Sequence, residues 1–263
     1  MTVPPPPQLH ARAAAVLEAS TGTPVFGLHG GERMLVASTT KMVTALVTVN
    51  AVPLRKVCTA PPYVATPDES LLGLATGERM NVADLLRGML VVSGNDAAAD
   101  LARCVAGSTK AFVGRMNATV RRLRLKHTHF ANPVGLDAPG NFSSAADLDR
   151  IAIAVRANPF LRETVELRHV TLHGGLHPRA LTNRNTLLLD VPWINGVKTG
   201  HTNAAGWILV ASGTQHGLTF VASVIGDPDE ATRDADAKAL LDWAFANARP
   251  PSVPGARLPE RVP

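Results

Sequence analysis

The stretch Ser38-Thr39-Thr40-Lys41 decides how this chain folds around its chemistry. Apolar residues follow it at helical spacing up to residue 49, which predicts a helix that begins at or just before Ser38. Residues three apart share one face of a helix, so the Lys41 amine can reach the Ser38 hydroxyl. The N–H groups and the positive dipole end of a helix start also favour an anion there. This pattern indicates a serine nucleophile beside its base.

Two further motifs follow in the chain, Ser93-Gly94-Asn95 and Lys198-Thr199-Gly200. S-x-x-K alone is weak, because an N-cap serine followed by a solvated lysine matches it at any helix start. The ordered set of S-x-x-K, S-x-N and K-T-G is much more specific, since class A β-lactamases and penicillin-binding proteins share it.

The sequence as a whole resembles the low-molecular-mass penicillin-binding proteins that are serine-type D-alanyl-D-alanine carboxypeptidases (peptidase S11). The resemblance covers roughly residues 10–246 and runs through LLRGMLVVSGNDAAADLA (85–102), FANPVGLD (130–137), SSAADLDRIA (143–152), TNRNTLL (182–188) and NGVKTGHTNAAGW (195–207). It implies an enzyme that removes the terminal D-Ala from peptidoglycan stem pentapeptides through a Ser38 acyl-enzyme, and that β-lactams inhibit covalently.

The resemblance also implies catalytic roles. Ser38 would attack the penultimate D-Ala carbonyl, and Lys41 would take its proton. Lys41 must be neutral for this, and burial together with the charge of Lys198 would lower its pKa. Ser93 would relay a proton between the lysines and the leaving amine, and Asn95 would hold the substrate amide or orient Lys41.

Substrate binding falls to a second group of residues. The backbone N–H groups of Ser38 and His201 are the expected oxyanion donors. The terminal carboxylate needs cations or hydroxyls, and the candidates for binding it or the rest of the peptide are Lys198, Thr199, Gly200, His201 and, from the resemblance of TNRN (182–185) to a family segment, Arg184. Asn195 stands where many relatives have Asp, which alters local hydrogen bonding and removes no catalytic group.

Strand patterns lie at both ends of the chain and helical patterns in the middle. We therefore expect an α+β fold, with an antiparallel sheet from both termini, flanking helices and an inserted helical lobe, as the resemblance to the serine β-lactamase and penicillin-binding-protein fold also implies. The expected organisation is a Pro-rich tail (1–9), one domain (10–247, with a sheet lobe 10–37 and 184–247 and a helical lobe 38–183) and a second Pro-rich tail (248–263).

Individual elements follow from the same periodicities. Expected strands cover 12–18, 24–29, 34–36, 170–172, 179–182, 196–200, 207–212 and 218–226, with strand-like pieces such as 70–74 within 54–80. Expected helices cover 38–52, 82–92, 96–105, 108–123, 145–157, 159–166 and 229–247, and Ser144 with Asp147 has the pattern of a capping box.

The amino-acid composition limits the classes of molecule that the protein is expected to bind. The chain has 46% hydrophobic and 18% charged residues, which suits a globular protein with a large core. Its net charge of +5 is compatible with an anionic wall polymer or nucleic acid. The dense basic run 121–126 sits at a predicted helix end without interleaved aromatics, so we expect a solvated face and no nucleic-acid partner.

The sequence also indicates the compartment in which the protein is expected to work. No run reaches the 18 apolar residues of a membrane span, and the start MTVPPPPQLH lacks the pattern of a signal peptide. We expect a mature or trimmed, extracytoplasmic and monomeric protein, on the periplasmic or wall side of the membrane, for which peripheral attachment to membrane or wall stays open.

Cysteines and histidines suggest little chemistry. Cys58 and Cys104 are the only cysteines, and Cys104 lies on a predicted apolar helix where a buried free thiol is ordinary, so free thiols are favoured over a disulfide. His169, His173 and His177 have ligand-like spacing in a strand and loop region where that spacing does not converge on one face. No metal or cofactor is predicted there, nor at His127 with His129.

Functions other than a carboxypeptidase would use the same three motifs. A class A β-lactamase needs a deacylating glutamate with a nearby asparagine, and Glu163 and Glu166 lack the accompanying Leu-Asn. A transpeptidase or endopeptidase with this site, and a penicillin-recognising sensor that acylates without turnover, both remain open.

Overall fold

A five-stranded antiparallel sheet forms from the two ends of the chain, which confirms the predicted fold class. The computed structural model describes residues 4–248. The strands lie in the order β2-β1-β9-β8-β7, so the N-terminal hairpin pairs with β9 at the centre and β7 forms an edge. They are β1 (Ala13–Glu18), β2 (Pro24–Leu28), β7 (Ile194–Thr202), β8 (Gly206–Gln215) and β9 (Leu218–Asp227).

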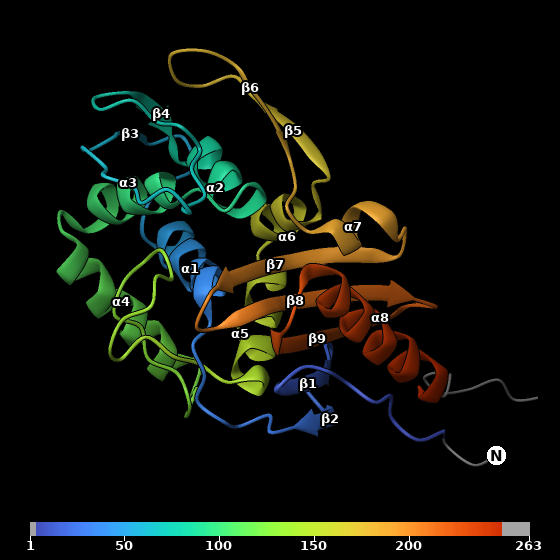
Figure 1. Cartoon of the computed structure of the whole chain (residues 1–263). Helices are drawn as coiled ribbons and strands as arrows, with labels where there is room; N and C mark the ends of the chain where they lie inside the picture. Colours follow the sequence, from blue (N-terminus) through green and yellow to red (C-terminus); the bar gives the residue numbers. More distant parts are fainter. Residues whose placement is uncertain (1–3, 249–263) are drawn as a thin grey trace, which may run out of the picture.

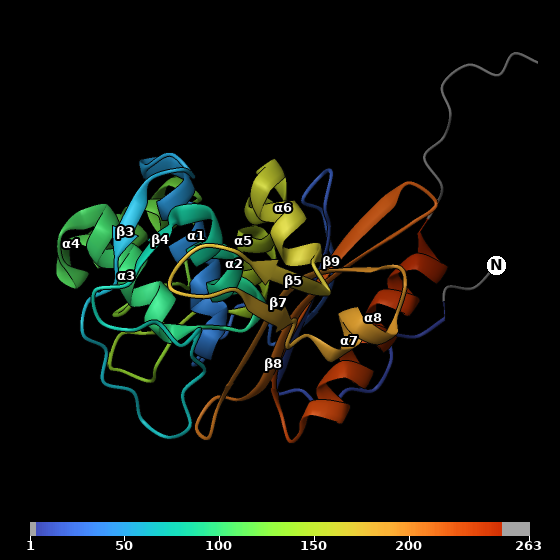
Figure 2. The ribbon, with the colours of Figure 1, turned by 90° about the horizontal axis from the view of Figure 1, so that it is seen from above.

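Helices cover both faces of this sheet (Figures 1 and 2). They are α1 (Lys41–Ala51), α2 (Val82–Val91), α3 (Asn95–Ala106), α4 (Thr109–Arg122), α5 (Ala145–Ala157), α6 (Pro159–Glu166), α7 (Thr186–Asp190) and α8 (Glu230–Asn247), with a 3-10 turn, Ala37–Thr40, before α1. Seen from above, α8 lies on one side of the sheet and α1 and α5 lie on the other (Figure 2). The helical segments thus match the predicted ranges, except for the short α7.

Two hydrophobic cores explain why these strands are apolar on both faces. Successive side chains of a strand point to opposite faces. In β8, Ile208 and Val210 join the large core shared with the helices of the middle of the chain, whereas Leu209 and Ala211 join the core under α8. Because the sheet is covered on both sides, strict alternation of apolar and polar residues is lost.

Two short hairpins complete the chain. One is β3 (Val57–Thr59) with β4 (Arg79–Asn81), and the other is β5 (His169–Leu172) with β6 (Arg179–Thr182). The second projects away from the sheet beyond α6 (Figure 1). No helix within residues 4–248 combines the length and apolar character that crossing a bilayer requires.

Three local predictions were wrong. Residues 34–36 form no strand, because only Met34 pairs, in an isolated bridge with Ser143. Residues 70–74 are irregular. The Ser144 hydroxyl does cap α5 by accepting from the Asp147 N–H, but the Asp147 carboxylate accepts from Thr128 and the His127 N–H, so the reciprocal half of a capping box is missing.

The predicted N-terminal tail is packed where it is described. The Pro4 carbonyl accepts a 2.9 Å hydrogen bond from the Trp243 indole, and Leu9 packs against the core under α8. The predicted C-terminal tail, 248–263, lies outside the described residues from 249 onward.

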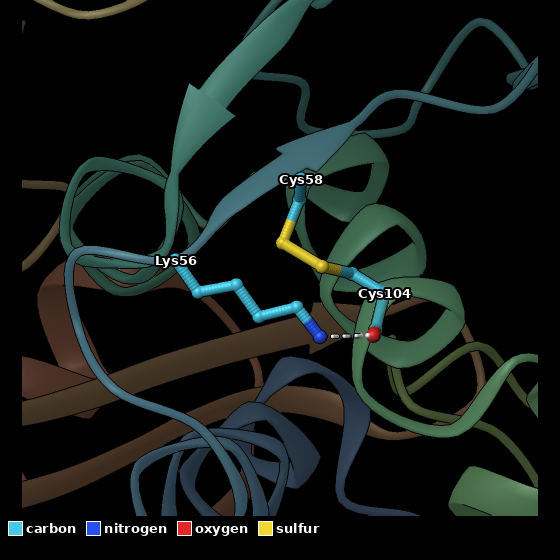
Figure 3. Close-up of a disulfide and its surroundings, with 3 residues drawn as sticks. All are labelled: Lys56, Cys58 and Cys104. Atoms are coloured by element: carbon cyan, nitrogen blue, oxygen red, sulfur yellow. Dashed lines mark hydrogen bonds between the residues drawn. A yellow bond between two sulfur atoms is a disulfide. The ribbon is translucent and has the colours of Figure 1, made fainter.

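The expectation of free thiols is also wrong, because Cys58 and Cys104 form a disulfide (Figure 3). The bond joins β3 to the last turn of α3, and the nearby Lys56 amine donates to the Cys104 carbonyl at 3.0 Å. The helix predicted around Cys104 is present, as α3. Its periodicity carries no information about β3, the strand that places Cys58 next to Cys104.

This disulfide should contribute to stability. It closes a sequence separation of 46 residues, for which the loss of chain entropy in the unfolded state is worth roughly 2–4 kcal/mol. We expect the Cys58→Ala/Cys104→Ala variant to lose about that much unfolding free energy in urea titrations. Dithiothreitol should lower the stability of the wild type to a similar level and leave the variant unchanged. Equal midpoints for oxidised and reduced wild type would contradict the expectation.

Candidate active site

The turn that carries Ser38 is held in an unusual backbone conformation. Ala37, the residue before it, has φ of 44°, which is uncommon for a residue with a side chain. Gly135 packs against this turn, and a Cβ on it would lie 2.0 Å from the Ala37 carbonyl oxygen. Thr44 of α1 donates to the Pro133 carbonyl at 2.7 Å. The loop of residues 132–137 therefore fixes the start of α1.

Lys41 lies beneath Ser38, as the motif predicts. Its Nζ is 2.8 Å from Ser38 Oγ and 2.5 Å from the Val134 carbonyl oxygen, and the side chain is fully buried. Burial, and then the charge of Lys198, hold the pKa of Lys41 well below its usual value. A neutral amine at hydrogen-bond distance can accept a hydroxyl proton, which is the arrangement that activates a serine nucleophile.

Ser93 lies in the turn between α2 and α3, and Asn95 is the first residue of α3. Ser93 has φ of 63°, a strained conformation of the kind that functional sites hold in place. Its hydroxyl accepts from Lys198 Nζ at 3.2 Å. The second motif is thereby connected to the third across 105 residues of sequence.

Lys198 is the second buried lysine of the site, with 2% of its surface exposed. Burial, followed by the charges of Arg184 and Arg233, lowers its pKa to about 7. Its Nζ also donates to the Thr199 carbonyl at 2.9 Å. Near neutral pH this amine can therefore exchange a proton with Ser93.

Strand β7 presents the K-T-G motif along the cleft. It pairs with β8 on one side only. A Cβ on Gly200 would approach the Ser38 nitrogen to 3.3 Å and the Val36 carbonyl oxygen to 3.2 Å, so a side chain there would crowd the nucleophile turn. An edge strand that runs this close to the serine can bind an extended peptide beside it.

One cavity of the cleft contains two arginines, Arg184 and Arg233. A cavity of about 370 Å³ is lined by the predicted residues Ser38, Ser93, Arg184, Thr199, Gly200 and His201, together with Arg233, Glu230, Thr186, Trp207, Asp68 and Ser70. The structure thus brings together at this cavity every predicted site residue except Lys41 and Lys198, which lie buried beneath it, and Asn95, which lines the adjoining cavity.

Arg233 was not predicted to be a site residue. It closes the first turn of α8, with 1% of its surface exposed, and it donates to Asp234 at 2.6 Å, to Thr186 at 3.0 Å and to Glu230 at 3.1 Å. Its guanidinium lies 5.6 Å from the Trp207 ring, which also stacks on His201 at 4.2 Å. The spacing of Arg233 from Ala237 and Leu240 places it on the buried face of α8. A charged residue at a position that the helical pattern buries could have identified Arg233 as a candidate site residue from the sequence.

Glu69 was also missed. Its carboxylate accepts from Asn95 Nδ2 at 2.8 Å and from the Tyr63 hydroxyl, and so orients the Asn95 amide. Burial raises its pKa, but the hydrogen bonds from Thr66, Tyr63 and Asn95 lower it overall. Residues 54–80 carry no recognisable motif, so only the folded chain places Glu69 here.

Other residues singled out in the sequence lie apart from this chemistry. Asn195 bonds to Thr214 and Ser212 within the β7–β8 pair, as expected for a change that removes no catalytic group. Within residues 4–248, no three His, Cys, Asp or Glu side chains gather in a way that could hold a metal ion.

The fold and the three motifs around one cleft define the class of penicillin-binding proteins. A family model described as D-alanyl-D-alanine carboxypeptidase matches residues 1–229, and the chain belongs to this family.

Individual relatives agree with this assignment. The chain is 35% identical to the D-alanyl-D-alanine carboxypeptidase DacA of Haemophilus influenzae over 92% of its length and 63% of the relative's. It is 34% identical to DacD of Escherichia coli over 93% of its length and 65% of the relative's. The chain therefore spans a little under two thirds of these relatives.

Solved structures are similar as well. The Streptomyces K15 DD-transpeptidase superposes with a TM-score of 0.88 at 30% identity, covering 92% of this chain and all of that one. Penicillin binding protein 5 from Haemophilus influenzae gives 0.85 at 34% identity, covering 92% of this chain and 73% of that one.

The lowered pKa of Lys198 predicts a pH-dependent stability. A free lysine titrates near 10.4, so between about 7 and that value the unfolded chain binds more protons than the folded one. The contribution of this residue to the unfolding free energy therefore rises with pH in this window. Relative to Lys198→Met, we expect the wild type to gain about 1 kcal/mol per pH unit above pH 7.

Urea unfolding at a series of pH values between 7 and 9 measures this gap. A Lys238→Met variant, which removes an exposed lysine paired with Asp242, serves as the control and should run parallel to the wild type. A constant gap between the wild type and Lys198→Met would show that Lys198 titrates normally in the folded protein.

Proposed function

We propose that the protein is a serine-type D-Ala-D-Ala carboxypeptidase, which removes the last residue of peptidoglycan stem pentapeptides. The observation that carries this proposal is the 2.8 Å contact between Ser38 Oγ and the fully buried amine of Lys41. The family, and relatives named as D-alanyl-D-alanine carboxypeptidases, supply the substrate class.

Acylation begins at Ser38. Neutral Lys41 accepts the hydroxyl proton while Oγ attacks the penultimate D-Ala carbonyl carbon, and the Ser38 and His201 backbone N–H groups hold the oxyanion. The proximity of Gly200 to the Ser38 nitrogen supports this pairing of donors. When the tetrahedral intermediate collapses, the C–N bond breaks and an ester to Ser38 remains.

The leaving D-Ala needs a proton on its amine. Ser93 and Lys198, 3.2 Å apart, form the route by which the proton taken by Lys41 reaches that nitrogen, and Asn95 holds the substrate amide. Water then attacks the ester with Lys41 again as base, which releases the shortened peptide and restores Ser38.

The terminal carboxylate lies beside Arg184. This arginine is exposed and lines the same cavity as Thr199, so a cation and a hydroxyl converge as carboxylate recognition requires. The carboxylate would also stabilise the charged form of Lys198, because an opposite charge raises the pKa of an amine.

This function implies a location and partners. The stem peptide is the substrate, β-lactams that mimic it acylate Ser38, no nucleic acid or cofactor takes part, and the protein works as an extracytoplasmic monomer. Membrane or wall attachment would be peripheral.

A DD-transpeptidase is the second candidate, because the Streptomyces K15 structure bears that name and is covered in full by this chain. The same acyl-enzyme would then pass to an amine in place of water. A class A β-lactamase is less well supported, since Glu166 pairs with Arg156 at 3.3 Å and neither Glu163 nor Glu166 lines the cleft at Ser38.

Release of D-Ala from diacetyl-L-Lys-D-Ala-D-Ala tests the proposal. We expect the wild type to release D-Ala, penicillin to stop the release, and Ser38→Ala to lower kcat/KM by about 10³-fold or more, because no other nucleophile can form the ester. Ser20→Ala, a matched change in the exposed β1–β2 turn, should be fully active.

Product analysis with added glycine or D-Ala as acceptor separates the two candidates. A transpeptidase would form a new peptide at the expense of hydrolysis. Absence of both products, alongside penicillin bound covalently at Ser38, would instead indicate a sensor without turnover.

A further inference from the structure

Most of the positive charge of the chain lies in one segment. Residues 101–136 contain seven lysines and arginines and no aspartate or glutamate, whereas the whole chain has a net charge of +5. The rest of the sequence is therefore slightly acidic. The segment comprises the C-terminal half of α3, all of α4 and the residues that follow it, and its cations are Arg103, Lys110, Arg115, Arg121, Arg122, Arg124 and Lys126.

These seven side chains face solvent without a counter-charge. Each is exposed, and within residues 4–248 none of them forms an ion pair with a carboxylate. The apolar face of α4, with Phe112, Met116 and Val120, is buried in the large core, so only the charged face is open to a partner. The helix lies at the edge of the molecule opposite α8 (Figures 1 and 2). Cations concentrated on one outer edge attract polyanions.

The four cations of α4 form two rows. With 3.6 residues per turn and a rise of 1.5 Å per residue, Arg115 and Arg122 lie about 10 Å apart along the side of the helix next to α1. Lys110 and Arg121 lie on the other side of the same exposed face, about 16 Å apart. A ligand must carry repeated negative charges to meet these positions together. No bulky side chain stands between the rows, because the exposed residues there are Ala111, Gly114 and Ala118.

A groove follows the first of these rows. It has a volume of about 200 Å³ between α4 and the C-terminal end of α1, and its polar lining consists of Arg115, Arg122, Asn50 and Thr119, without a carboxylate among the described residues. The Thr119 hydroxyl accepts from the Arg122 guanidinium at 3.3 Å, which holds that cation at the groove. A narrow groove with cationic and neutral polar walls fits a linear chain better than it fits a flat surface.

We propose that this face of α4 binds a linear polymer of the cell envelope whose repeating anionic groups are phosphodiesters. Five of the seven cations are arginines, and the arginine fork can bind two phosphate oxygens at once. The exposed residues of α4 include no aromatic side chain on which bases could stack, and no large apolar side chain that could enter a bilayer. The chemistry is therefore that of a sugar-phosphate or alditol-phosphate chain.

The polymer site is separate from the catalytic site. None of the seven cations lines either cavity of the cleft, so a polymer bound to α4 leaves the cleft free for the stem peptide. The envelope as the source of the polymer rests on the location under the proposed function, whereas binding itself requires no catalytic step. Binding at this face would hold the enzyme at the wall that contains its substrate.

The salt dependence of binding follows from the number of contacts. Each cation that neutralises a phosphate of a single strand contributes a slope of about −0.7 to the logarithm of affinity against the logarithm of salt concentration. Four contacts, one for each cation of α4, predict affinity that falls roughly 50-fold between 50 and 200 mM salt.

Titration calorimetry with purified polyglycerol phosphate tests the proposal. We expect the wild type and Ser38→Ala to bind the polymer equally, because the nucleophile is not part of this face. Arg115→Gln/Arg122→Gln removes two contacts from the groove, so it should weaken binding about tenfold or more at 50 mM salt and reduce the salt slope by about half.

A matched variant controls for net charge. Arg162→Gln/Lys238→Gln removes the same charge from α6 and α8 and should bind the polymer like the wild type. The rate of penicillin acylation at Ser38 should be unchanged in both double variants, which reports that each retains its fold.

Several results would overturn the proposal: no binding of the polymer by the wild type at 50 mM salt, or equal weakening in the two double variants. Vesicles of phosphatidylglycerol bound through Arg115 and Arg122, without binding of the polymer, would assign the face to a bilayer. A single-stranded oligonucleotide with the same number of phosphates, bound tenfold more tightly than the polymer, would assign it to nucleic acid.

The assay for D-Ala release keeps this proposal distinct from the proposed function. Release of D-Ala by a wild type that does not bind the polymer would defeat the polymer site alone. Binding of the polymer without release of D-Ala would defeat the carboxypeptidase and leave the polymer site of α4 in place.

Discussion

The candidate active site depends on one lysine amine that is kept out of contact with solvent next to one serine. Lys41 Nζ is fully buried 2.8 Å from Ser38 Oγ, and burial is the largest cause of its lowered pKa. A charged amine is costly in that position, so burial favours the neutral form of the lysine, which is the form that the proposed base requires. The two hydrophobic cores and the Cys58–Cys104 disulfide supply the stability that offsets a buried lysine pair and the strained backbone at Ala37 and Ser93.

Three segments that lie far apart in the sequence meet to form the cleft. The 3-10 turn before α1 brings Ser38, the turn between α2 and α3 together with the first residue of α3 brings Ser93 and Asn95, and the edge strand β7 brings Lys198. Each of these positions is an element boundary or a sheet edge, where side chains and backbone groups are not consumed by regular structure. The candidate catalytic residues therefore lie where the helices meet the sheet.

Charge is distributed unevenly along this cleft. Burial, and then the charges of Arg184 and Arg233, lower the pKa of Lys198 to about 7. Asp137 lines the adjoining cavity, and Asp68 lines both cavities. The two lysines are buried beneath the cleft, whereas Arg184, Asp68 and Asp137 are exposed along it.

The sequence by itself determined the local features: the pairing of Ser38 with Lys41 one helical turn apart, the helical ranges, and the presence of strands near both termini. These follow from the periods of helices and strands, which act over a few residues. Only the tertiary structure decided that Cys58 meets Cys104, that Glu69 orients Asn95, and that Arg233 lines one cavity with Ser38. Such contacts join segments that no local pattern relates, because packing of the whole chain, and not periodicity, brings them together.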